Sequence, residues 1–107
     1  MSKVGEHITI DIIGTEKEYD PSVFEKLIYD IAKAAKVEIL NVVKYKFEPQ
    51  GFTILALLAE SHISFHTFPE KGIISFDFFT CGKINPSVAV DIIKKEIVNS
   101  NRIVLPH

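Results

Sequence analysis

The stretch FTILALLAESHISFHTFPEKGIISFDFFT (residues 52–80) contains three apolar segments separated by two breaks, and it decides the fold class. Residues 52–59 and 73–80 are rich in aliphatic and aromatic side chains, and residues 62–67 alternate between apolar and polar ones. Both patterns are typical of β-strands. Because the breaks are short enough for hairpins, we expect three neighbouring antiparallel strands here.

The flanking sequence predicts more strands. Residues 7–13 alternate isoleucine with polar residues, which is the period of a strand with one covered face. Residues 37–47 are rich in β-branched residues and are followed by the turn residues Glu48-Pro49-Gln50-Gly51. Residues 102–105 are long enough for a short edge strand. The sheet is therefore expected to extend on both sides of the three central strands.

Two further segments have the spacing of amphipathic helices, and each begins with a capping residue followed by a proline. Asp20-Pro21 supplies an N-cap and a first-turn proline for a helix to about residue 36, and Asn85-Pro86 does the same for a helix to about residue 100. The order β-α-β-β-β-β-α-β predicts one α+β domain over residues 1–107. In it, two helices cover one face of an antiparallel sheet.

The strands carry apolar residues on both faces, for example Phe52 and Ile54 on one face against Leu55 and Leu57 on the other. Large exposed apolar patches are rare on soluble monomers. We therefore expect the face without helices to lie at or near a homodimer interface. The alternative is a sheet that curls enough to cover itself.

Composition excludes several classes of protein. The chain has 107 residues, of which 47% are hydrophobic and 24% charged, and its net charge is −2, so it has no electrostatic footprint for nucleic acid or an anionic membrane. A single cysteine excludes an internal disulfide and a four-thiolate zinc site. We find no signal-peptide pattern and no apolar run of membrane-spanning length, and we expect a cytoplasmic protein with small-molecule or protein partners.

Residues 60–81 hold most of the candidate reactive groups, including the only cysteine. A zinc site shared by His62 and His66 fails on geometry, because four residues along a strand separate them by about 13 Å. A cysteine hydrolase built from Cys81 and His66 is possible in principle, since the two could meet across adjacent strands. That interpretation leaves Glu60 and Ser61 without a role.

A third interpretation uses these two residues. The hydroxyl of Ser61 can attack the carbonyl of Glu60 and convert the peptide bond into an ester, and elimination then cuts the backbone. The new N-terminus would be a dehydroalanine that tautomerises and hydrolyses to a pyruvoyl group. Such a ketone, as a Schiff base with an amine, is an electron sink of the kind that pyridoxal phosphate provides.

The run ESHISFHTFPE (residues 60–70) followed by FTCG (residues 79–82) resembles the small prokaryotic S-adenosylmethionine decarboxylases, which are pyruvoyl enzymes of polyamine synthesis. The resemblance extends to residues 5–11, to residues 46–51 and to the helix at residues 86–95. It therefore covers nearly the whole chain.

The resemblance implies autocatalytic cleavage between Glu60 and Ser61, which gives a β chain of residues 1–60 and an α chain of residues 61–107. Ser61 would be the pyruvoyl precursor and Schiff-base former, and His66 the base that removes the Cα proton during processing. Thr53 would hydrogen-bond the carbonyl of Glu60, and Cys81 would be the proton donor after decarboxylation.

For the substrate, the resemblance implies that Phe47 and His66 sandwich the adenine of S-adenosylmethionine and that Glu70 holds the ribose hydroxyls. The product would be the aminopropyl donor for spermidine. The implied enzyme is a homodimer of cleaved protomers that uses no metal and no pyridoxal phosphate. Two alternatives remain open at this point: an arginine decarboxylase of the same family, and an unprocessed, non-catalytic homologue.

Overall fold

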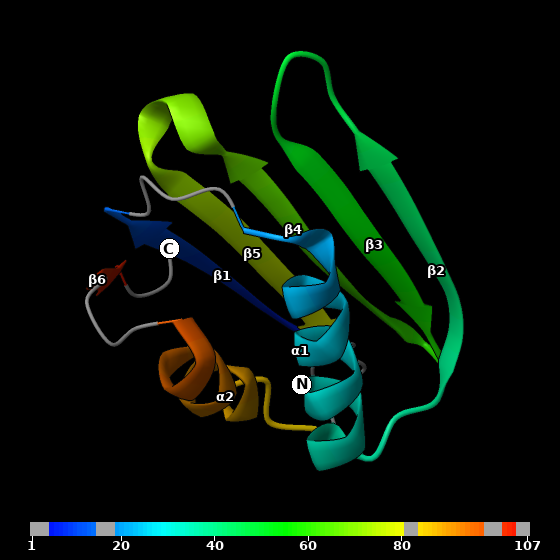
Figure 1. Ribbon diagram of the computed structural model, residues 1–107. Coiled ribbons are helices and arrows are strands. Elements are labelled where there is room, and N and C mark those ends of the chain that lie inside the picture. Colours follow the sequence, from blue (N-terminus) through cyan, green and yellow to red (C-terminus); the bar gives the residue numbers. More distant parts are fainter. Residues whose placement is uncertain (1–4, 15–18, 81–83, 98–101, 105–107) are drawn as a thin grey trace.

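The computed structural model describes residues 5–14, 19–80, 84–97 and 102–104, and it forms one sheet with two helices (Figure 1). The elements in chain order are β1 (Glu6–Ile13), α1 (Pro21–Ala35), β2 (Ile39–Lys46), β3 (Phe52–Leu58), β4 (Ser61–Phe68), the short 3-10 helix η1 (Pro69–Lys71), β5 (Ile73–Thr80), α2 (Val88–Ile97) and β6 (Arg102–Val104). The predicted α+β class and element order are confirmed.

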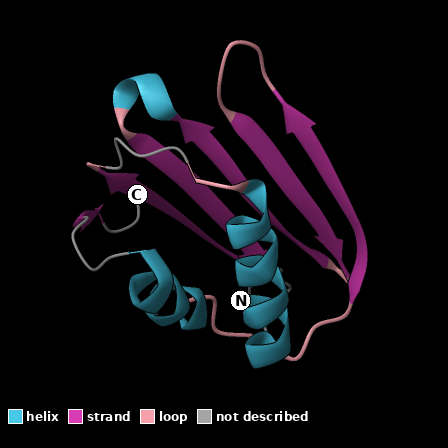
Figure 2. Ribbon diagram, in the orientation of Figure 1, coloured by secondary structure: helices cyan, strands magenta, loops and turns pink. Residues whose placement is uncertain are grey.

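The six strands lie in the order β2-β3-β4-β5-β1-β6, and every neighbouring pair is antiparallel. Residues 52–80 form the three consecutive strands expected from their hairpin connections. β1 lies between β5 and β6, so the chain crosses the sheet twice, through α1 and through α2 (Figure 1). Both helices cover the same face, as Figure 2 shows, and the opposite face is open.

The core lies between the helices and the covered face of the sheet. Phe24 of α1 packs against Phe52 and Phe65, with ring centroids 5.3 and 5.0 Å away, and Phe65 in turn packs against Phe76 at 4.8 Å. Phe24, Phe65 and Phe76 are fully buried. Burying one such side chain stabilises the fold by about 1.5–3 kcal/mol, so this aromatic group fixes α1 on the sheet.

Helix α1 begins and ends where the sequence predicts. The Asp20 carboxylate accepts a hydrogen bond of 2.9 Å from the backbone N–H of Ser22, Pro21 follows the cap, and Lys36 closes the helix in a left-handed conformation (φ 59°). The hydrogen bonds from Ser22, the backbone one above all, lower the pKa of Asp20.

Helix α2 begins at Val88, two residues later than predicted. The side chain of Asn85 accepts a hydrogen bond of 3.0 Å from the N–H of Ser87, and Ala89 N–H bonds the carbonyl of Pro86. These contacts form a tighter three-residue turn before the α-helix starts. Residues 98–100, into which the helix was expected to extend, lie outside the described residues.

The open face is apolar over only part of its area. Across β2 and β3, Val43 pairs with Leu55 and Tyr45 pairs with Thr53. The four apolar side chains here are 43–63% exposed: Val43, Tyr45, Leu55 and Leu57. We call Val43, Tyr45, Leu55 and Leu57 the β2–β3 patch. The rest of this face, over β4, β5 and β1, is mainly polar. The apolar residues expected on the open face of β3 are confirmed, and the sheet does not curl to cover them.

None of the described helices is both long and apolar enough to span a lipid bilayer.

A close approach of the chain near β1 allows a test of the fold. A Cβ added at Gly5 would overlap the carbonyl oxygen of Thr80 and the ring of Phe79, whereas at Gly14 (φ 88°) it would meet nothing within 4 Å. We expect Gly5→Ala to lower the free energy of unfolding by about 2 kcal/mol, because β5 has to shift. Gly14→Ala should cost only about 1 kcal/mol of backbone strain. Urea denaturation measures both, and equal losses would contradict the close approach.

Candidate active site

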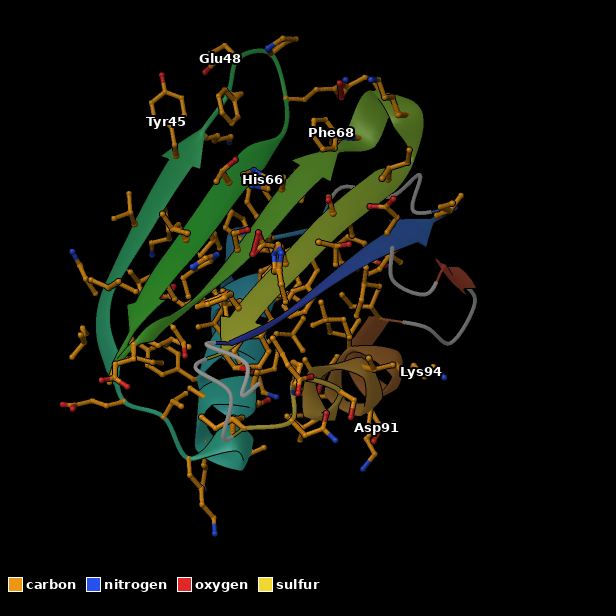
Figure 3. The ribbon with its side chains drawn as sticks, turned by 180° about the vertical axis from the view of Figure 1, so that it is seen from behind. Tyr45, Glu48, His66, Phe68, Asp91 and Lys94 are labelled. Carbon is orange, nitrogen blue, oxygen red and sulfur yellow. The ribbon has the colours of Figure 1, made fainter. Side chains whose placement is uncertain are left out.

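A pocket of about 270 Å³ opens at the end of the sheet where the β2–β3 loop meets η1. Four of its lining residues are ones that the sequence singled out: Phe47, Thr53, His66 and Glu70. The others are Gln50, Thr67 and Phe68. In Figure 3, which looks onto the open face, His66, Phe68 and Tyr45 lie toward the same end as Glu48 of the β2–β3 loop.

Strand pairing places the central polar pair of this pocket. Thr53 of β3 lies directly opposite His66 of β4, and Thr53 Oγ1 is 2.8 Å from His66 Nδ1. A hydrogen bond to one ring nitrogen sets the orientation of the imidazole and leaves Nε2 for other contacts. The sequence predicted both residues, but not that they contact each other.

The wall of the pocket is held by the β2–β3 loop. The N–H of Phe47 bonds the carbonyl of Gly51 at 2.8 Å, and the N–H of Phe52 bonds Thr67 Oγ1 at 3.0 Å. Gly51 adopts φ 92°, a conformation that favours glycine. These bonds attach the loop to β4 and leave the ring of Phe47 about half exposed beside the pocket.

Sequence reasoning missed Gln50, Thr67 and Phe68 as pocket residues. Gln50 was read as turn chemistry, and Thr67 as the end of a strand. The ring of Phe68 is 39% exposed and lies under the ammonium of Lys71, 5.8 Å from the ring centroid. All three lie in segments that carry the family resemblance, but only the pairing of β3 with β4 places their side chains at one opening.

The second feature of interest is the β3–β4 hairpin. Leu58 pairs with Ser61, so the connection is the two-residue turn Ala59-Glu60. Glu60 has φ 62°, which costs a non-glycine residue roughly 1–2 kcal/mol. Two-residue hairpin turns normally have a positive φ at their first residue. Here the first residue, Ala59, does not have one, and the second, Glu60, does. The turn is therefore strained directly before the Glu60–Ser61 peptide bond.

Ser61 itself is 6% exposed, and its buried Oγ has no hydrogen-bond partner among the described residues. Leaving a buried hydroxyl without a partner costs about 1–3 kcal/mol. Strained backbone and unpaired buried groups both concentrate at functional sites. In this hairpin the strained residue, Glu60, and the unpaired hydroxyl, that of Ser61, lie on the two sides of one peptide bond.

The pocket and this hairpin lie at opposite ends of β4. Ser61 and His66 are five residues apart, which is about 17 Å along a strand. Because five is an odd number, their side chains point to opposite faces of the sheet. Ser61 lies across from Leu58 on the covered face, and His66 lies across from Thr53 on the open face. Within one chain, His66 and Thr53 are therefore far from the Glu60–Ser61 bond on which the family resemblance implies that they act.

Cys81, the predicted proton donor, lies outside the described residues. The described part of β5 ends at Thr80, which is fully buried and donates a hydrogen bond of 3.1 Å from its hydroxyl to the carbonyl of Ile84.

Comparisons with known proteins show the family and the fold. The sequence profile of the family described as S-adenosylmethionine decarboxylase matches residues 6–104. The S-adenosylmethionine decarboxylase proenzyme of Methanococcus vannielii is 44% identical over 85 residues, which are 78% of this chain and 70% of that protein. The proenzyme of Prochlorococcus marinus is 40% identical over 101 residues, 92% of this chain and 81% of that protein.

A solved structure gives the same result. The crystal structure of the adenosylmethionine decarboxylase from Aquifex aeolicus superposes with a TM-score of 0.78 and 30% sequence identity, covering 98% of this chain and 90% of that one. The matches in sequence and in structure both span nearly all of the sheet and helices. The chain therefore belongs to the S-adenosylmethionine decarboxylase family.

Proposed function

We propose that this protein is a pyruvoyl-dependent S-adenosylmethionine decarboxylase that matures by cutting itself between Glu60 and Ser61. The observation that carries the proposal is the hairpin, where a strained residue and an unpartnered hydroxyl adjoin the same peptide bond. Its relatives are named as proenzymes, which agrees with a maturation step. The product, decarboxylated S-adenosylmethionine, would donate aminopropyl groups for spermidine synthesis.

The cut proceeds in two stages. Ser61 Oγ attacks the Glu60 carbonyl carbon, so the C–N bond is replaced by an ester C–O bond and the amine of residue 61 is released. Loss of the Cα proton of residue 61 and cleavage of its Cβ–Oγ bond then release Glu60 as a carboxylate and leave a dehydroalanine. This tautomerises to an imine, which water hydrolyses to the ketone with release of ammonia. Strain at Glu60 is relieved when its peptide bond breaks, so it lowers the cost of the first stage.

The fold is suited to a cut at this place. The break falls between the turn and the first residue of β4, so the ladder between β3 and β4 beyond residue 61 is kept. β1, from residues 1–60, lies between β5 and β6, from residues 61–107. The two fragments therefore interlock in one sheet, and cleavage does not release either of them from the native protein.

The separation along β4 supports a homodimer with shared sites. Two copies of the chain could pack their open faces together around a two-fold axis that runs between the faces, perpendicular to the strands. This symmetry would bring the pocket end of one sheet over the Ser61 end of the other. The β2–β3 patch supplies apolar surface for such a contact. The pocket of one subunit, with Thr53 and His66, would then act on the Glu60–Ser61 bond of the other.

In this arrangement the pocket residues bind the substrate. Phe47 and His66 would hold the adenine between an aromatic ring and an imidazole, and the Glu70 carboxylate would accept hydrogen bonds from the ribose hydroxyls. The pyruvoyl group supplies the electrophilic ketone that makes loss of carbon dioxide possible. Cys81 would then return a proton to the substrate α-carbon.

Mass spectrometry and carbon dioxide release test the proposal together. Under denaturing conditions the wild-type protein should separate into fragments of residues 1–60 and 61–107, the second without a free amine, and should release labelled carbon dioxide from S-adenosylmethionine. Ser61→Ala should fold but stay whole and inactive, because it lacks the attacking hydroxyl. An unbroken wild-type chain would refute processing, and release from arginine alone would refute the proposed substrate.

Complementation between subunits tests the shared site. Ser61→Ala and His66→Ala chains should each remain uncut alone. When they are co-expressed with different tags, part of the His66→Ala chains should be cut, because a mixed dimer contains one site with both residues intact. About a quarter of the wild-type number of sites should be active if the chains mix at random. If the His66→Ala chain is never cut in the mixture, His66 acts within its own chain, and if it is cut when expressed alone, His66 has no part in processing.

The Thr53–His66 hydrogen bond can be tested on its own. Thr53→Val keeps the shape of the side chain but removes the hydroxyl 2.8 Å from Nδ1, and Thr53→Ser retains it. We expect Val to slow processing about three- to tenfold, the worth of one neutral hydrogen bond, and to change the ¹⁵N shifts of the His66 ring. Serine should behave as wild type. Equal rates and ring shifts in all three proteins would show that the hydroxyl does not orient His66.

A further inference from the structure

A cluster of three side chains lies on the open face, apart from the pocket. Its members are His7 of β1, His62 of β4 and Asp77 of β5, and their ligand atoms all lie within 4.8 Å of one another. β5 lies between the other two strands, so the carboxylate stands between two imidazoles. Neither the pocket nor the proposed cleavage uses these residues.

The register of the sheet fixes this arrangement. His7 and His62 both lie opposite Phe79, one on each side, and Asp77 lies two residues earlier on the same face of β5. The ring of Phe79 stacks on His62, with centroids 5.7 Å apart and planes at 18°, and meets His7 edge-on at 6.3 Å. Phe79 thus holds both imidazoles in place beside the carboxylate.

Each imidazole stands beside a different oxygen of Asp77, at a distance longer than a hydrogen bond and close to that between two ligands of one zinc ion. His7 Nε2 is 3.4 Å from Asp77 Oδ2, and His62 Nε2 is 3.3 Å from Asp77 Oδ1. Charge-assisted hydrogen bonds between nitrogen and oxygen are about 2.7–2.9 Å long, and Oδ1, although buried, has no hydrogen-bond partner among the described residues. Two ligands bound at about 2.1 Å to a tetrahedral zinc ion stand about 3.4 Å apart.

We propose that His7, His62 and Asp77 bind one divalent transition-metal cation of the zinc class. Two imidazoles and one carboxylate suit zinc and its neighbours, whereas magnesium and calcium prefer all-oxygen sites. In a single chain the three side chains are 50%, 41% and 30% exposed, so the site has room for a further ligand. The binding itself does not depend on the proposed function.

The site also has a structural consequence that rests on the proposed cleavage. His7 belongs to residues 1–60, and His62 and Asp77 belong to residues 61–107, so the bound cation would join the two fragments of a matured chain. The cation binds the folded sheet and not the unfolded chain, because only the sheet brings the three ligands together. It should therefore raise the melting temperature of the protein.

Titration of the metal-free, full-length protein with Zn²⁺ tests the proposal. Calorimetry should show one saturable site per chain, and His7→Gln and Asp77→Asn should each weaken it at least about tenfold. Asp91→Asn is the matched control, since it removes an exposed carboxylate of α2 on the other side of the sheet, and it should bind as wild type. The uncut Ser61→Ala protein should bind equally, which separates this result from the fate of the cleavage proposal.

Cobalt identifies the ligands. Co²⁺ at the proposed site should give the visible bands of a nitrogen and oxygen environment without a thiolate charge-transfer band, because Cys81 takes no part. Loss of saturable binding in Asp91→Asn, a thiolate band, or equal binding by wild type, His7→Gln and Asp77→Asn would each overturn the proposal. So would wild-type protein that shows no saturable binding and no thermal shift with Zn²⁺.

Discussion

The alternation of side chains along β4 is the constraint on which the rest of the structure depends. Ile63 and Phe65 must face the helices, because Phe65 packs on Phe24 and both are fully buried. A strand has a period of two, so His62 and His66 must then face the open side. A slip of one residue would bury both imidazoles in the aromatic core and expose that core to water.

This alternation gives the sheet two ends with different chemistry. At one end, Thr53 and His66 face each other inside a pocket that the β2–β3 loop closes. At the other end, the β3–β4 turn holds the strained Glu60 and the unpartnered hydroxyl of Ser61. Since one strand joins the two ends, a single chain cannot bring them together. The shared site that we propose therefore follows from the length of β4, which keeps the two ends of one chain apart.

The contact with a second copy and the metal site that we propose lie on different parts of the open face. Its apolar part, the β2–β3 patch, is suited to a second copy of the chain, and its polar part carries the cluster of His7, His62 and Asp77. Both parts follow from the absence of a helix on this side, because a covered face would have selected apolar residues throughout. The proposed cut and the proposed metal site also meet here, since the cluster lies across the seam between the two fragments.

The sequence by itself determined the α+β class, the order of the elements, the ends of α1, and the family, because hydrophobic period, capping residues and a dense local motif are all properties of neighbouring residues. It also identified Phe47, Thr53, His66 and Glu70, which line the pocket, and Ser61, which lies in the strained hairpin. Only the tertiary structure decided that Thr53 contacts His66 of the same chain, that the pocket lies about 17 Å from Ser61, and that His7, His62 and Asp77 converge. These relations depend on which strands become neighbours and in what register. Such pairing is set by the packing of the whole core, which no local stretch of the chain encodes.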